Sequence, residues 1–148
     1  MKTIMIYTST HHGNTEKIAQ AMGGVLKADL HSLDKENISS INLEGYDLIG
    51  LGTGVKAQKP YPKMMQAVDK LDLKDRKVFL FSTSAGNELG EILPLKEKVQ
   101  GKGARLAGEF MCAGFFDWAF MKLMGGYNKG HPDEADLENA RKFAQSLK

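Results

Sequence analysis

The sequence alternates between short apolar runs and longer segments whose apolar residues recur at helical spacing. Four runs are apolar almost throughout and are predicted to be buried strands: residues 3–8, 46–52, 77–82 and 104–112. Residues 28–33 alternate between polar and apolar side chains, which predicts an edge strand. Strands that are apolar on both faces are typical of a parallel sheet covered by helices on each side.

Four further segments carry apolar residues three or four positions apart, as on one face of a helix. These positions are Ile18, Met22 and Val25 in residues 14–27; Met64, Val68 and Leu71 in 61–71; Ile92, Leu95 and Val99 in 91–100; and Leu137, Ala140, Ala144 and Leu147 in 132–147. Gly101 predicts the end of the third helix, and Pro132 with two acids after it predicts the start of the fourth. Alternating strands and helices predict an α/β protein with a three-layer, doubly wound parallel sheet.

Composition and charge narrow the function classes. The 148 residues fit a single domain, 1–148, and 42% hydrophobic residues allow a core without disulfides. The net charge is only +2 and basic residues are mixed with acids along the chain, which argues against nucleic-acid binding. The single cysteine excludes an internal disulfide and indicates a reducing compartment. No apolar run has the length of a membrane span or a signal-peptide core, so we expect a cytoplasmic protein.

Ligands of open parallel sheets bind beyond the carboxyl ends of the strands, so the loops that follow strands are the candidate sites. The first loop, residues 8–15, combines hydroxyl side chains with the start of a helix, whose free amides and dipole favour an anion. This composition suits a phosphate held by neutral groups, or an ordinary capped turn. It is neither a Walker loop nor a GxGxxG motif, because Gly13 is its only glycine.

The second loop, residues 50–62, reads GLGTGVKAQKPYP. Its glycines at 50, 52 and 54 are interpreted as allowing a ligand to approach the backbone closely. The alternative is a flexible connector in which Pro60 and Pro62 open the next helix.

Two more loops follow later strands. Residues 82–90, STSAGNELG, are short polar residues after a strongly apolar strand, as in a binding loop or a simple turn. Residues 113–132 are rich in aromatic residues and are interpreted as a segment packed on the core, with a wall over a flat ligand or a partner surface as alternatives. The aromatic residues there are Phe115, Phe116, Trp118 and Phe120.

With these motifs in view, the chain resembles the flavodoxin family over nearly its whole length. The resemblance rests on Ser9, Thr10, Gly13, Asn14, Thr15, Glu16 and Lys17, on GLGTG at 50–54, on FSTSAGN at 81–87, and on GEFMCAGF and NKGHPDEADLENARKFA near the end. It implies a five-stranded parallel sheet in the order 2-1-3-4-5 and non-covalently bound FMN. It also implies electron transfer to or from a redox partner protein, with the flavin passing between oxidised, semiquinone and hydroquinone states.

The resemblance also implies which residues contact the flavin. The phosphate would be held by Ser9, Thr10, His11, His12, Gly13, Asn14 and Thr15. The ring would lie along Thr53, Gly54, Val55, Lys56 and Ala57, and its pyrimidine side would meet Thr83, Ser84, Ala85, Gly86 and Asn87. No side chain is assigned acid–base catalysis. No metal site is expected, because His11 and His12 are adjacent and the remaining histidines, 31 and 131, lack ligand spacing.

Three features depart from the family pattern. The phosphate loop has one extra residue and two histidines, which either contact the phosphate or are exposed spacers. Residues 83–87 contain no aromatic to stack on the flavin, which leaves Tyr61 and Trp118 as candidates. The chain is slightly basic, whereas electron-carrying flavodoxins are usually strongly acidic. Because Lys56 would stabilise an anionic reduced flavin, we expect a less negative reduction potential than that of a low-potential carrier.

Alternative functions remain open from sequence alone. One is an FMN-dependent NAD(P)H:quinone or flavin reductase, although no second phosphate loop is evident. Another is a flavin-free binding module on the same fold. A response-regulator receiver is disfavoured, because Ser9–Thr10 and Gly52–Thr53 stand where it needs acids. Cys112 is interpreted as a small buried hydrophobe rather than a redox thiol, and we expect a monomer or a weak homodimer.

Overall fold

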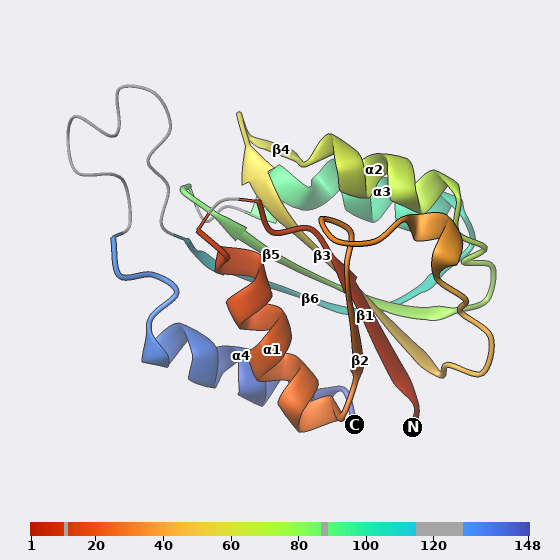
Figure 1. Ribbon diagram of the computed structural model, residues 1–148, viewed down its shortest axis with the longest axis horizontal. Coiled ribbons are helices and arrows are strands. Elements are labelled where there is room, and N and C mark those ends of the chain that lie inside the picture. The colour runs from red at the N-terminus through yellow and green to blue at the C-terminus, as the bar shows by residue number, and fades with distance from the viewer. Residues whose placement is uncertain (11, 87–88, 115–128) are drawn as a thin grey trace.

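A computed structural model describes residues 1–10, 12–86, 89–114 and 129–148 as an α/β fold (Figure 1). In chain order its elements are β1 Thr3–Tyr7, α1 Asn14–Leu26, β2 Asp29–Ser32, η1 Ile38–Ser40, β3 Leu48–Lys56, β4 Lys59–Pro60, α2 Pro62–Asp69, β5 Lys77–Ser84, η2 Leu89–Ile92, α3 Leu93–Gly101, β6 Arg105–Ala113 and α4 Glu134–Ser146, where η marks a 3-10 helix. No helix in this described part is long and apolar enough to span a bilayer.

The sheet confirms the topology expected from the sequence. Its parallel strands lie in the order β2-β1-β3-β5-β6, which is 2-1-3-4-5 when only the parallel strands are counted. One short strand was not expected: β4 pairs antiparallel with the end of β3 and forms a hairpin with it. Strand β3 is correspondingly longer than predicted and runs on to Lys56.

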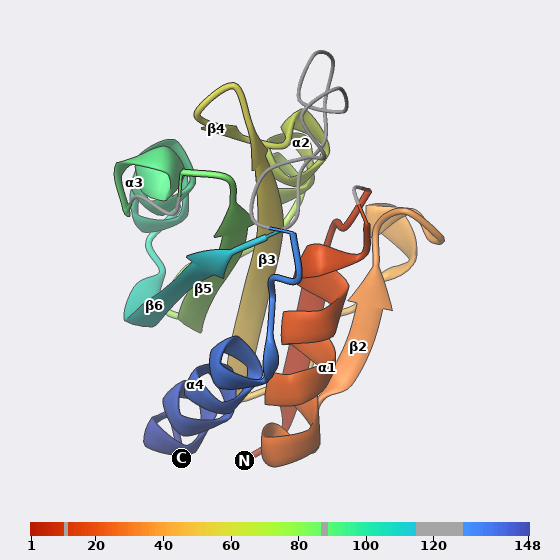
Figure 2. The same ribbon diagram turned by 90° about the vertical axis from the view of Figure 1, so that its left-hand side faces the viewer.

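Helices cover both faces of the sheet, and in the view of Figure 2 helices α1 and α4 lie in front of it. Helices α1 and α4 pack over one face, against Met5, Phe79 and Phe81 among others. Helices α2 and α3 cover the other face, against Leu51 and Leu80 among others. The alternation of these residues along each strand follows from the period of two in a pleated strand.

Two of the glycines interpreted as ligand contacts serve the core instead. Gly50 is paired in register with Phe79, and Gly52 with Phe81. A Cβ at Gly50 would lie 2.4 Å from the Phe79 ring, and one at Gly52 would lie 2.1 Å from the Phe81 ring. The two rings, whose centroids are 6.0 Å apart, therefore occupy the space that side chains at positions 50 and 52 would need.

The helix ends lie within two residues of the ends of the predicted segments. Gly101 is the last residue of α3 rather than the residue after it, and the backbone N–H of Lys102 closes the final turn. Helix α4 begins at Glu134, two residues after Pro132, because Asp133 and Asp136 form a reciprocal capping box.

Candidate functional site

The carboxyl ends of three central strands are joined side by side at one edge of the sheet. The backbone N–H of Thr8, just after β1, donates to the carbonyl of Gly52 in β3. The hydroxyls of Thr15, in the first turn of α1, and Thr83, near the end of β5, are 2.9 Å apart and both buried. The structure thus brings the predicted phosphate loop and the start of segment 83–87 together.

The β1–α1 turn has the backbone of a tight binding loop. His12 and Gly13 both adopt left-handed conformations, with φ of 53° and 65°. Gly13 is the N-cap of α1 and supplies no side-chain cap. Instead, the Ser9 hydroxyl oxygen accepts the backbone N–H of Glu16 at 3.0 Å. Ser9 therefore caps the helix from outside it and keeps its own hydroxyl proton for another acceptor.

Asp34 holds this turn through hydrogen bonds to its backbone and side chains. The sequence did not predict this role. The Asp34 carboxylate accepts the backbone N–H of Ser9 at 2.6 Å and the Thr8 hydroxyl at 3.1 Å. The Lys63 ammonium, on α2, lies 3.5 Å from the same carboxylate. The only indication in the sequence was an acid directly after a predicted edge strand, which by itself is common.

Tyr61 links the second loop to the phosphate loop. The Tyr61 ring fills the space beside Gly54, so that a Cβ added at Gly54 would lie 2.7 Å from the ring. A side-chain hydrogen bond joins Tyr61 to Thr10. The residue is only 8% exposed. Burial raises the pKa of the Tyr61 hydroxyl, the bond to Thr10 partly offsets that rise, and the Asp34 charge adds to it.

Segment 53–57 is a strand and hairpin rather than an open loop. The Thr53 side chain is buried and its hydroxyl oxygen accepts the backbone N–H of Tyr61 at 3.2 Å. Val55 points into the core beneath α2 and α3, whereas Lys56 and Ala57 are exposed. Figure 1 shows this hairpin projecting beyond the carboxyl edge of the sheet. Of the five predicted residues, Gly54 lies beside Tyr61, and Val55 packs in the core instead.

Segment 83–87 lies next to an unexpected buried acid. Thr83 and Ser84 are buried, while Ala85 and Gly86 are more exposed. A Cβ at Gly86 would lie 2.4 Å from a carboxylate oxygen of Glu91, a residue that is only 7% exposed. An acid at this place opposes the formation of further negative charge nearby.

His11, Asn87 and the aromatic stretch within 115–128 lie outside the described residues. Cys112 is 4% exposed, and burial together with the charge of Asp136 raises the pKa of its thiol. Its burial agrees with a small hydrophobe at this position. His131, Asp133 and Asp136 could each offer a ligand atom to a metal ion, but their contacts are those of the cap of α4.

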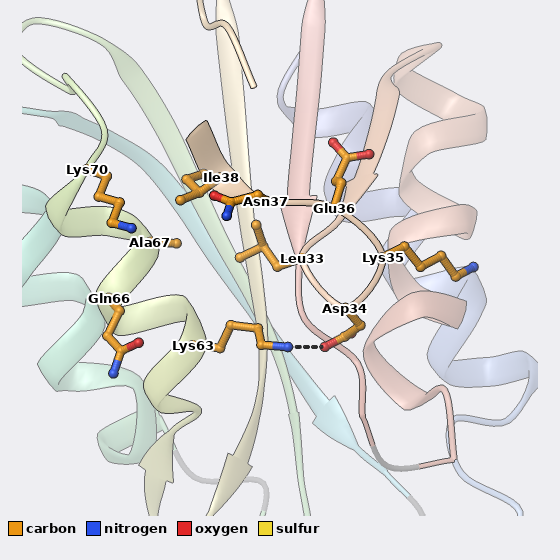
Figure 3. Close-up of a pocket in the computed structure, with 10 residues that line it drawn as sticks. All are labelled: Leu33, Asp34, Lys35, Glu36, Asn37, Ile38, Lys63, Gln66, Ala67 and Lys70. Atoms are coloured by element: carbon orange, nitrogen blue, oxygen red, sulfur yellow. Dashed lines mark hydrogen bonds and ion pairs between the residues drawn. The ribbon is translucent and has the colours of Figure 1, made fainter. Parts of the chain in front are cut away.

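A cavity of about 410 Å³ lies on the far side of Asp34, between residues 33–38 and helix α2 (Figure 3). The ion pair between Lys63 and Asp34 bounds it on the side of the β1–α1 turn, and Leu33, Ile38 and Ala67 give it an apolar wall. The cavity therefore shares Asp34 with the turn but is separate from the junction of the three strand ends.

Comparison with known proteins identifies the family. The flavodoxin domain model matches residues 5–115, which include all of β1 to β6 except the first two residues of β1. The chain belongs to the flavodoxin family. An uncharacterized protein of Methanocaldococcus jannaschii is 39% identical over 99% of this chain and 98% of its own.

Solved structures show the same fold. Oxidised flavodoxin 1 of Bacillus cereus superposes with a TM-score of 0.70 at 23% identity, covering 99% of this chain and 97% of its own. General stress protein 14 of Treponema denticola, solved in complex with FMN, gives a TM-score of 0.66 at 13% identity and covers 100% of both chains. At such identities the likeness concerns the fold.

Proposed function

We propose that the protein binds FMN at the carboxyl edge of the sheet and carries electrons between other redox proteins. The observation that supports this most is the β1–α1 turn, where neutral hydroxyls, a glycine N-cap and the start of a 13-residue helix meet. A phosphate monoester is a dianion, which gains from the helix dipole and from several charge-assisted hydrogen bonds. Family membership and the FMN complex of the Treponema protein support the same choice of ligand.

The residues present fit the phosphate group. The Ser9 hydroxyl retains a proton to donate, because its oxygen already accepts the Glu16 amide. Thr10 adds a second hydroxyl, shared with Tyr61. Bound FMN would supply the one- and two-electron chemistry, while the chain orients it and controls access to it.

Two charges bear on the reduction potential. Lys56 is exposed on the hairpin, where solvent and salt weaken its field, whereas Glu91 is buried beneath Gly86. If Lys56 dominates, Lys56→Gln makes the potential more negative; if Glu91 dominates, Glu91→Gln makes it less negative. Potentiometric titration of both variants tests the expectation of a less negative potential. If Lys56→Gln keeps the wild-type potential, Lys56 has no such role.

Binding is tested by titrating the purified protein with FMN and with riboflavin and following the flavin fluorescence. Ser9→Ala removes one charge-assisted donor, so we expect about 10- to 100-fold weaker FMN binding. Riboflavin lacks the phosphate, so its affinity should change far less and reveal any general damage to the helix cap. Ser146→Ala, at the far end of α4, is the matched control. Equal losses for FMN and riboflavin would contradict the phosphate assignment.

Anaerobic photoreduction then separates the candidate functions. A long-wavelength absorbance band at the one-electron stage supports a single-electron carrier. Direct passage to the two-electron form, with NAD(P)H oxidation in the presence of a quinone, supports the reductase instead. A spectrum that stays that of free FMN supports a flavin-free binding module.

A further inference from the structure

The β3–β4 hairpin carries two unfavourable local features at the edge of the candidate site. Its two-residue turn consists of Ala57 and Gln58, with φ of 52° and 63°. Such turns strongly prefer Asn and Gly, because left-handed conformations are costly for residues with a Cβ. Backbone strain of this kind concentrates at functional positions.

The second feature is electrostatic. Lys56 and Lys59 are directly opposite each other in the hairpin register, both exposed, and like charges in this position repel. Among the described residues no acid forms an ion pair with either ammonium group. Both side chains lie on the exposed surface of the hairpin.

Three of the described acids near this edge have partners within the fold or are buried. Glu16 accepts the Tyr7 hydroxyl, Asp34 accepts the Ser9 amide, and Glu91 is buried. Their charges are thus engaged within the fold, and the two hairpin lysines form an outward-facing positive rim beside the site. Charged rims steer partners of opposite charge and speed their association.

We propose that this rim, Lys56 and Lys59, docks an acidic redox protein whose carboxylates face the hairpin. We expect the partner to be a protein because the electrons of a bound flavin have to pass to another redox centre. This step rests on the proposed function. The charge assignment itself does not require flavin, so binding can be measured with the flavin-free chain.

The test uses Lys59→Glu, because Lys59 is outside the candidate flavin contacts. In this variant a carboxylate would stand opposite the Lys56 ammonium, and the attractive pair favours the hairpin conformation. Lys142→Glu, exposed on α4, makes the same charge change away from the site. The probes are a strongly acidic plant-type ferredoxin and, with opposite charge, a basic cytochrome c.

Calorimetric binding of the flavin-free chain and stopped-flow electron transfer of the FMN-loaded chain are measured at low and high salt. At low salt, Lys59→Glu should weaken ferredoxin binding about fivefold and slow electron transfer to ferredoxin by a similar factor. The same variant should bind cytochrome c more strongly than wild type does. At high salt both differences from wild type should disappear. Lys142→Glu should change either quantity less than about twofold. Equal effects of the two variants, or none, would overturn the proposal. The proposal would also be overturned if Lys59→Glu weakened binding to phosphatidylglycerol vesicles but left ferredoxin binding unchanged. The rim would then face a membrane. If FMN fails to bind, the calorimetric arm still decides the docking.

Discussion

Replacing Gly52 with alanine tests whether the β3 glycines serve the core or a ligand. The new Cβ would lie 2.1 Å from two ring carbons of Phe81. That ring is fully buried and stacked at 6.0 Å on Phe79, so it cannot swing aside freely. Overpacking of a well-packed core costs about 1–3 kcal/mol, and so short a contact places Gly52→Ala near the upper end, at about 3 kcal/mol.

The assay is urea denaturation followed by circular dichroism, with a double-mutant cycle. Phe81→Leu alone should cost about 1–1.5 kcal/mol, because it exchanges one buried apolar side chain for another. In the double variant the smaller leucine leaves room for the alanine methyl, so the two costs should fall short of additivity by at least about 1 kcal/mol. Strict additivity would refute the steric reasoning. A large loss of FMN affinity with unchanged stability would restore the interpretation of Gly52 as a ligand contact.

Three further predictions concern other parts of the molecule. Lys102→Met should lower the free energy of unfolding by about 1 kcal/mol, because the Lys102 ammonium donates to the last two carbonyls of α2 at 2.8 and 2.9 Å. The control variant Lys142→Met should have little effect on the free energy of unfolding. The Cys112 thiol should react with a disulfide reagent at least about 100-fold more slowly in the native protein than in urea, since burial raises its pKa and blocks access; a comparable native rate would contradict this. The hydrogen bond to Asp136 raises the pKa of His131 above 6.5. The stability that His131 contributes should therefore be complete below pH 6.5 and decrease as pH rises through the raised pKa. Urea denaturation at several pH values should show this pH dependence of the free energy of unfolding in wild type and not in His131→Gln.

The elements and the helix faces could be predicted from local pattern, whereas the strand order followed from the resemblance to the flavodoxin family. Apolar runs such as residues 77–82 allow few alternatives to a buried strand, and residues such as Ile18 and Met22 recur at the period of a helix. The predicted phosphate loop and the start of segment 83–87 also meet, since parallel strands place their carboxyl ends at one edge.

The hairpin was missed because its turn has the wrong residues for a sequence-based prediction. Lys56 to Lys59 read KAQK, with neither the Asn nor the Gly that indicates a two-residue hairpin turn. The roles of Gly50 and Gly52 were misread for a different reason. A glycine that admits a ligand and one that admits a cross-strand phenylalanine look the same in sequence, and only the register with β5 distinguishes them.

The contact between Asp34 and Ser9 spans 25 residues and changes how the phosphate loop would work. It engages the Ser9 backbone amide, which is therefore not available to a phosphate. A phosphate at this turn would depend instead on the Ser9 and Thr10 hydroxyls and on the start of α1. The same contact holds the turn in place through groups of the chain itself, with Thr15 and Thr83 holding it from the other side. A turn that is already ordered loses less conformational entropy when a ligand binds, and that preorganisation favours affinity even with one backbone donor fewer.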